Sequence, residues 1–139
     1  ASPSYLERHR DLPLAVPEDL VRHECLSYTQ VPVPNVWRFE DRVGVRAEVR
    51  IPTRHRVNNG RMLVALAVDG VGVVYEPDFI VAPEIQSGRL VTLLPQFQPV
   101  QSPISAVYPS RRHLSAKVRA VVAFLAERFS RQQDWSLED

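Results

Sequence analysis

Few residues of this chain could bind a ligand or do chemistry, and the clearest are Asn58 and Asn59, which directly precede an apolar stretch. An Asn side chain in this position can accept a hydrogen bond from a free amide in the first turn of a helix and so cap it. The same free amides, together with the helix dipole, also make a helix start a place where an anion can bind. Capping needs only one of the two asparagines, so the residues alone leave both capping and ligand contact open.

Two other groups of residues could suggest a metal site or a catalytic Ser/His pair, but neither has the complete pattern. The run His23-Glu24-Cys25 contains metal-ligand types, but a zinc site needs three or four converging ligands and no second paired motif is present. We expect Cys25 to be a small buried residue at the start of a strand and His23 to end a helix. Ser110 and His113 are close in sequence, but Ser110 follows a proline, as a turn residue does, and no Gly-x-Ser-x-Gly motif occurs. We therefore expect no catalytic residue, no metal ion and no cofactor.

The glycines of Gly70-Val71-Gly72 resemble part of a dinucleotide-binding fingerprint, but their order in the chain is wrong for one. That fingerprint runs from a strand through glycines into a helix, so that the phosphates meet the start of the helix. Here the glycines follow the apolar stretch and precede a short apolar strand. They are better explained as the end of a helix, where glycine supplies the left-handed conformation.

The elements around these residues are predicted to form a βαβ unit. Residues 59–69 are predicted to form a helix with almost no polar face, buried on most sides. Residues 45–51 alternate between apolar and charged types, as a half-exposed strand does, and residues 71–75 form a wholly apolar strand. Together they indicate a parallel pair of strands joined by a helix.

Elsewhere the pattern predicts short elements and one long helix. Residues 115–129 carry one apolar stripe, Val118, Val121, Val122, Leu125 and Phe129, at helical spacing. The shorter predicted elements are a helix at 4–9, a helical turn at 17–22, strands at 25–29 and 37–39, a loop at 31–35, a hairpin turn at 41–44, a helix at 79–85 bent near Pro83, strands at 90–94 and 104–108, and a loop at 95–103.

Composition narrows the class of protein. A chain of 139 residues, 45% hydrophobic, forms one domain or part of one. Its net charge of +1, with Arg111-Arg112-His113 as the densest positive cluster, does not indicate a nucleic-acid surface. No stretch has the roughly 20 apolar residues of a membrane span, and no signal peptide is visible. A single cysteine suits a reducing compartment, and the absence of an initiator Met leads us to expect a fragment of a longer protein.

The whole chain resembles the LysR-type transcriptional regulators, specifically the second half of their effector-binding (LysR substrate-binding) domain. The resemblance covers roughly residues 1–129 and rests on short pieces in a fixed order. These pieces are 1–6, 17–20, 23–26, 37–39, 57–60, 70–73, 77–79, 87–91 and 106–115. Tyr75-Glu76 departs from the family, which more often has small or apolar residues before this proline, and so does the proline-rich loop at 31–35.

The resemblance implies an α/β fold like that of type II periplasmic binding proteins, whose two lobes enclose a small-molecule effector. It implies that residues 1–139 supply the second lobe, a mixed sheet flanked by helices, and then the return segment of an incomplete first lobe. The DNA-binding domain is then absent, and DNA is a partner only through that missing N-terminal domain. It also implies a non-enzymatic, cytoplasmic, homo-oligomeric regulator that does not bind membranes.

Carried over residue by residue, the resemblance nominates Val57, Asn58 and Asn59 as effector contacts, with Thr53 as a weaker candidate. A small carboxylate would suit the positive end of the helix that follows. Two alternatives use the same fold: a solute-binding protein of a transporter, and an enzyme with a catalytic group in the cleft. Fold alone does not decide between them.

Overall fold

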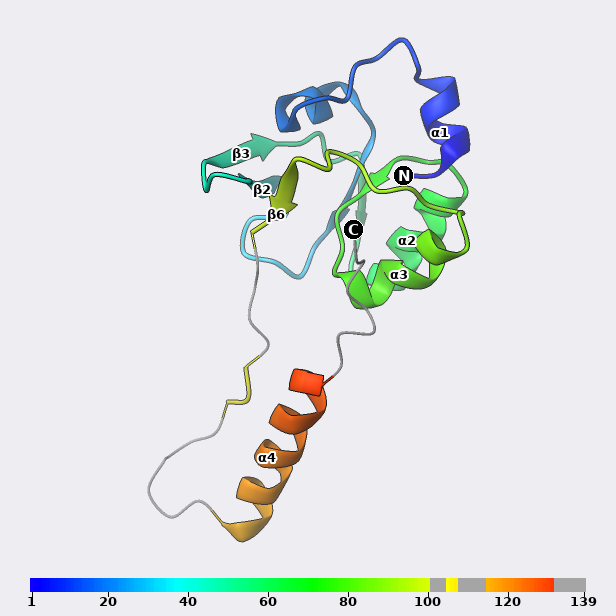
Figure 1. Ribbon diagram of the computed structural model, residues 1–139. Helices are drawn as coiled ribbons and strands as arrows, with labels where there is room; N and C mark the ends of the chain where they lie inside the picture. Colours follow the sequence, from blue (N-terminus) through cyan, green and yellow to red (C-terminus); the bar gives the residue numbers. More distant parts are fainter. Residues whose placement is uncertain (101–104, 108–114, 132–139) are drawn as a thin grey trace. The chain divides into compact units, whose positions relative to one another are not determined.

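The computed structural model describes residues 1–100, 105–107 and 115–131 (Figure 1). The chain forms two compact units, residues 1–100 and residues 101–139, and each is described by itself. The first unit contains α1 (Pro3–Arg8), the 3-10 helix η1 (Pro17–Arg22), β1 (Cys25–Tyr28), β2 (Val36–Asp41), β3 (Arg46–Arg50), β4 (His55–Val57), α2 (Gly60–Val68), β5 (Val73–Val74), α3 (Asp78–Gln86) and β6 (Phe97–Pro99). The second contains α4 (Ala116–Arg131).

The first unit holds a parallel sheet in the order β4-β1-β5. A βαβ unit is therefore present, as predicted, but its first strand is not the one that the sequence indicated. The strand that enters α2 is β4, three residues long, and not residues 45–51. Both β4 and β5 pair with β1, with Tyr28 beside Val57 and Leu26 beside Val74. The parallel pair predicted between residues 45–51 and 71–75 is therefore wrong.

Residues 46–50 do form a strand, β3, but it belongs to a second, antiparallel sheet in the order β3-β2-β6. β2 and β3 form the predicted hairpin, whose turn contains Gly44 in the left-handed region (φ 86°). β6 lies at 97–99, inside the segment predicted as a loop, and residues 90–94 form no strand. The predicted strand at 104–108 lies partly outside the described residues, and its described part, 105–107, is not a strand.

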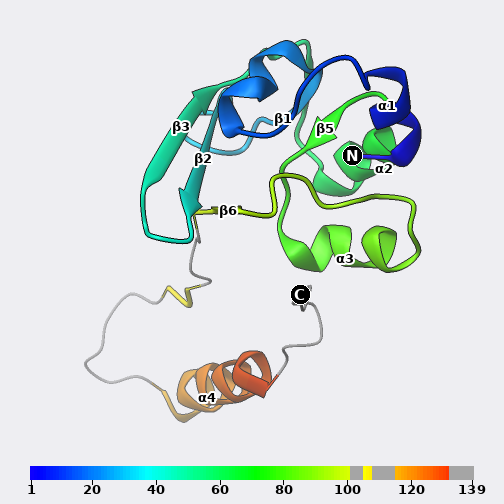
Figure 2. The ribbon, with the colours of Figure 1, turned by 45° about the horizontal axis from the view of Figure 1, so that its top comes forward.

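Two apolar clusters hold this unit together, and Figure 2 shows the two sheets and the helices around them. One cluster includes Trp37, Phe39 and Val49 from the antiparallel sheet, together with Tyr5 and Cys25. The other lies between the parallel sheet and the helices α2 and α3, and its buried members are Leu26, Leu63, Val64, Ala67, Val81 and Leu90. The carboxyl ends of β4, β1 and β5 thus emerge from a packed core, which fixes the loops that follow them.

Helix α2 is buried on one face only, which corrects the prediction that it is buried on most sides. Leu63, Val64 and Ala67 are buried, whereas Met62 (57% exposed) and Ala65 face solvent. The sequence pattern could not show this, because an apolar residue on a helix can pack against the core or lie at the surface. The helix ends as predicted: Gly70 has φ 76°, and the amide of Val71 donates to the carbonyl of Leu66 at 3.0 Å.

The predicted helices at 79–85 and 115–129 are both present. α3 contains Pro83, and a left-handed Gly88 (φ 73°) follows it. α4 carries the predicted apolar stripe, and Val121 is 57% exposed. None of the described helices is long and apolar enough to cross a bilayer.

Candidate functional site

The candidate site is the edge of the parallel sheet at which β4, β1 and β5 all end. Because the three strands are parallel, their carboxyl ends share one edge, and ligands of open α/β sheets bind outside that edge. The residues after the strands are Asn58 and Asn59 after β4, Thr29 after β1, and Tyr75 and Glu76 after β5. We call these residues, together with Tyr28 and Val57 at the strand ends, the carboxyl edge.

The two asparagines differ in their hydrogen bonds, which separates the capping residue from its neighbour. Asn59 is the cap of α2: its Oδ1 accepts a hydrogen bond from the amide of Met62 at 3.2 Å. Asn58 is exposed, and its side chain forms no hydrogen bond with the described residues. Capping therefore explains Asn59 and leaves Asn58 available for another partner.

Val57 and Thr53, the other two predicted contacts, lie at opposite ends of β4. Val57 is half-buried at the carboxyl edge, where its carbonyl accepts from the amide of Thr29 at 3.0 Å. Thr53 precedes β4, so residues 54–57, which include the whole strand, separate it from Asn58. The structure thus groups Val57, Asn58 and Asn59 and places Thr53 toward the other edge.

Glu76 is the residue of this edge that sequence reasoning missed. Its carboxyl group packs against the first residue of α2, where a Cβ added to Gly60 would lie 2.7 Å from Glu76 Oε2 and 3.0 Å from Ile80 Cδ1. Glu76 Oε1 is buried and has no hydrogen-bond partner among the described residues. Burial raises the pKa of Glu76 from its ordinary 4.5 to about 7. A charged residue directly after an apolar strand was the available signal, but the sequence could not show that this carboxyl is buried.

Glu76 should make the stability of the protein depend on pH. Between about pH 4.5 and pH 7 the folded state keeps a proton that the unfolded state releases, so stability falls as pH rises through this window. We expect Glu76→Gln to be more stable than the wild type by about 1–2 kcal/mol near pH 8 and equally stable near pH 4. This is less than the full value of the pKa shift, because Glu76 keeps some contact with water.

Urea unfolding at the two pH values measures this difference. Glu7→Gln is the matched control, because Glu7 is an exposed carboxylate paired only with the exposed Arg10. Equal stability of Glu76→Gln and wild type near pH 8 would show that the Glu76 carboxylate is well solvated.

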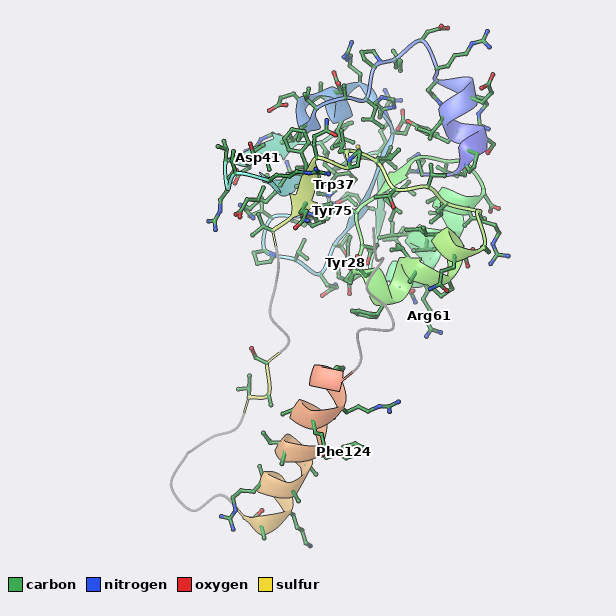
Figure 3. The ribbon with its side chains drawn as sticks, viewed as in Figure 1. Tyr28, Trp37, Asp41, Arg61, Tyr75 and Phe124 are labelled. Atoms are coloured by element: carbon green, nitrogen blue, oxygen red, sulfur yellow. The ribbon has the colours of Figure 1, made fainter. Side chains whose placement is uncertain are left out.

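Tyr75, the neighbour of Glu76, holds the edge in place and is not free for chemistry. Its ring stacks on the ring of Trp37, with centroids 5.1 Å apart (Figure 3). It also packs edge to face with the ring of Phe39, with centroids 5.5 Å apart. Its hydroxyl donates to the carbonyl of Arg38 at 2.6 Å. Burial also raises the pKa of Tyr75. Tyr75 thus ties the end of β5 to the antiparallel sheet.

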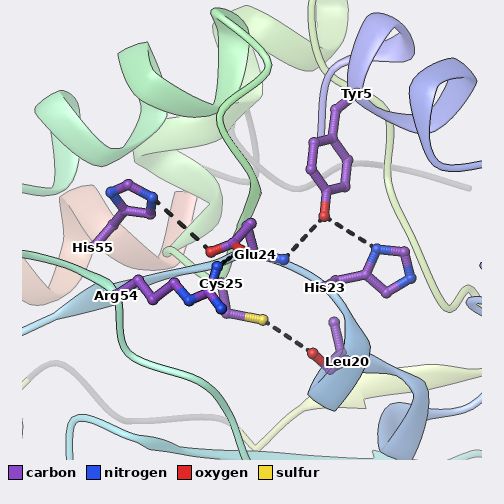
Figure 4. A network of polar contacts seen from close by, with 7 residues as sticks. All are labelled: Tyr5, Leu20, His23, Glu24, Cys25, Arg54 and His55. Carbon is purple, nitrogen blue, oxygen red and sulfur yellow. Dashed lines mark hydrogen bonds and ion pairs between the residues drawn. The ribbon is translucent and has the colours of Figure 1, made fainter.

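The opposite edge of the parallel sheet carries a polar network whose role is structural (Figure 4). The Tyr5 hydroxyl accepts from the amide of Glu24 at 3.0 Å and so can donate its own proton to Nδ1 of the buried His23, 3.1 Å away. The predictions for His23 and Cys25 are confirmed: His23 ends η1 and Cys25 is buried at the start of β1, where desolvation raises the pKa of its thiol to about 12. No metal-binding group of three His, Cys, Asp or Glu residues occurs in the described part of the chain.

The remaining sequence motifs contribute no chemistry to this edge. Gly70-Val71-Gly72 ends α2 and brings β5 against β1, where the amide of Val73 donates to the carbonyl of Glu24 at 2.8 Å. Ser110, His113 and the cluster Arg111-Arg112-His113 lie outside the described residues.

A family model and several known proteins match this chain over most of its length. Residues 1–130 match the family model of the LysR substrate binding domain. The HTH-type transcriptional regulator PtxR of Pseudomonas aeruginosa is 40% identical over 132 residues, which are 95% of this chain and 41% of PtxR. YagP of Escherichia coli K12, a LysR family substrate binding domain-containing protein by name, is 31% identical and covers 76% of this chain and 78% of its own length.

A solved structure of a LysR-type regulator is also similar to this chain. The structure of CrgA, a LysR-type transcriptional regulator from Neisseria meningitidis, is 32% identical, with a TM-score of 0.71, and covers 92% of this chain and 42% of CrgA. The chain therefore spans about two fifths of PtxR and of CrgA. PtxR and CrgA are named as transcriptional regulators and not as solute-binding proteins of transporters. The regulatory domains of LysR-type regulators have the fold of type II periplasmic binding proteins, and the parallel and antiparallel sheets of this chain agree with that fold. Because the family model matches residues 1–130, the chain belongs to the LysR substrate-binding domain family.

Proposed function

We propose that this chain is the second lobe and the return segment of the first lobe of the effector-binding domain of a LysR-type regulator. The match over residues 1–130 and the names of PtxR and CrgA support this function. The intact protein would be a cytoplasmic transcription factor without enzymatic activity, and it would bind DNA through an N-terminal domain. Effector binding would shift the equilibrium between two states of the domain, which requires a different affinity for each state.

The single observation that carries the proposed site is the different role of the two asparagines. Asn59 is occupied as the cap of α2, whereas Asn58 is exposed beside it with no hydrogen bond to the described residues. We assign Asn58 as the main side-chain contact to the effector, with Val57 at the edge of the pocket and Asn59 holding the first turn of α2 in place. Thr53 is the weaker candidate, because it lies before β4.

The proposed effector is a small molecule with a carboxylate. Asn58 can donate two hydrogen bonds from its amide nitrogen, and α2, whose first turn has amides without partners inside the helix, begins two residues later. Hydrogen bonds to a charged acceptor are about twice as strong as bonds between neutral groups. A carboxylate therefore gains more at this position than an uncharged ligand.

The proposed division of lobes also assigns a role to α4. Its apolar side chains Val118, Val121 and Leu125 are exposed, and exposed apolar stripes are usually covered by a partner. In the intact protein the missing half of the first lobe would cover them. Without that half, self-association of this chain is the outcome that we propose.

A thermal-shift screen of small carboxylates against this chain tests the proposed function. A ligand that binds only the folded state at 100 times its dissociation constant stabilises that state by about 2.7 kcal/mol, so a true ligand should raise Tm by several degrees. The shift should be smaller in Asn58→Ala and should persist in Glu7→Gln, the exposed control. A screen in which every shift is equal in the wild type and Asn58→Ala would contradict the proposed site.

A further inference from the structure

The starting point of this inference is the unpartnered carboxyl oxygen of Glu76. Oε1 is buried and accepts no hydrogen bond from the described residues. Native proteins leave few buried polar atoms without a partner, and each such atom calls for an explanation. The described part of the chain offers no cation either: Arg61, which follows Gly60 in α2, forms no ion pair with Glu76. The ionised form of Glu76 therefore lacks a hydrogen-bond donor among the described residues.

The position of Glu76 points to a ligand as the source of that donor. Glu76 follows β5 and Asn58 follows β4, on either side of the central strand β1. Two strand spacings separate β4 from β5, roughly 10 Å, and the Glu76 carboxyl reaches back to the first residue of α2. The Glu76 carboxyl thus lies at the start of α2, against a residue that follows Asn58 by two positions.

The charge of Glu76 decides which donor fits best. A bare carboxylate bound beside Asn58 would repel the ionised form of Glu76 and so keep this buried carboxyl protonated. A protonated amine on the same molecule would cancel this repulsion and would give Glu76 a charge-assisted hydrogen bond. Rotation about the terminal bond of a Glu side chain is soft, so the carboxyl can turn either oxygen toward the edge.

We propose that the effector carries a protonated amine as well as a carboxylate, and that Glu76 is the specificity residue that binds the amine. This inference rests on the proposed function, because it assumes that the effector binds at the carboxyl edge. It narrows the effector to the class of amino acids and related zwitterions. Glu76 then discriminates against carboxylates that lack an amine.

Glycine and acetate are the matched probes for this inference, because glycine is acetate with one added amine. Both are titrated into the isotope-labelled 139-residue chain near pH 8, above the pKa of Glu76, and the amide signals of residues 57–60 and the Glu76 carboxyl carbon are followed by NMR. We expect glycine to bind on the order of tenfold more tightly than acetate and to shift the Glu76 carbon signal. In Glu76→Gln this preference should disappear. Glu84→Gln should keep it, since Glu84 of α3 is paired with Arg89, which follows that helix.

The outcomes separate this inference from the proposed function on which it rests. If acetate and glycine shift the signals of 57–60 equally, and Glu76→Gln changes neither titration, the amine preference is wrong and the proposed site stands. If neither probe shifts those signals, both the proposed site and the role of Glu76 are wrong. A glycine preference that survives in Glu76→Gln would assign the amine to another residue and overturn the inference.

Discussion

Gly72→Ala should destabilise the chain by at least about 3 kcal/mol, because no space exists for a methyl group where β5 approaches β1. A Cβ at Gly72 would lie 2.3 Å from the carbonyl oxygen of Glu24 and 3.0 Å from its carbonyl carbon. Both are backbone atoms, so no side-chain rotation can relieve the clash. β5 would have to move away, and the hydrogen bond from the Val73 amide to the Glu24 carbonyl (2.8 Å) would be lost.

Urea unfolding followed by circular dichroism measures this effect, and Gly88→Ala is the control. Gly88 has a left-handed φ of 73° but nothing within 4 Å of an added Cβ, so only local strain of about 1–2 kcal/mol is expected there. Gly72 should therefore be the more costly site, even though it has no left-handed conformation to lose. A Gly72→Ala variant as stable as the wild type would show that β5 does not pack against β1 as described.

The elements predicted correctly from sequence are those with strong local signals. Helix α2 begins after a capping Asn59 and ends at Gly70, and both signals act within one turn of the helix. α4 is evident from an apolar stripe that spans its length. These features depend on neighbours in the chain, so the sequence alone contains the information.

Most errors of prediction involve partners that are distant in the chain, and one involves a strand with no local signal. Residues 45–51 alternate as a strand should, but nothing local states that the strand pairs with β2 and not with residues 71–75. β4 has only three residues, His55, Arg56 and Val57, and lacks any apolar pattern. Glu76 looks like a solvated charge after a strand, and only the fold shows that its carboxyl lies against Gly60. The candidate site could be located to one loop from sequence, but its other loops required the topology of the sheet.

The second large effect concerns Asn58, and it is the central prediction of the proposed function. Replacing Asn58 by Ala removes a side-chain amide that is not needed for capping, because Asn59 already caps α2. A lost hydrogen bond to a charged group should cost roughly 1.5–3 kcal/mol of binding free energy, which is about 10- to 150-fold in Kd. Asn59→Ala should instead lower stability by about 1 kcal/mol through loss of the cap. Val57→Ala should have a milder effect on binding, since Val57 contributes only apolar contact at the pocket edge.

Calorimetric titration of the intact regulator with the carboxylate found in the thermal-shift screen is the most direct test. Wild type, Asn58→Ala and Asn59→Ala are compared at one pH and one salt concentration, after circular dichroism has shown that each variant is folded. We expect Asn58→Ala to weaken binding about 10-fold or more while the protein stays as stable as the wild type. If Asn58→Ala folds normally and binds the effector with unchanged affinity, the Asn58 side chain does not contact the effector and the proposed site is wrong.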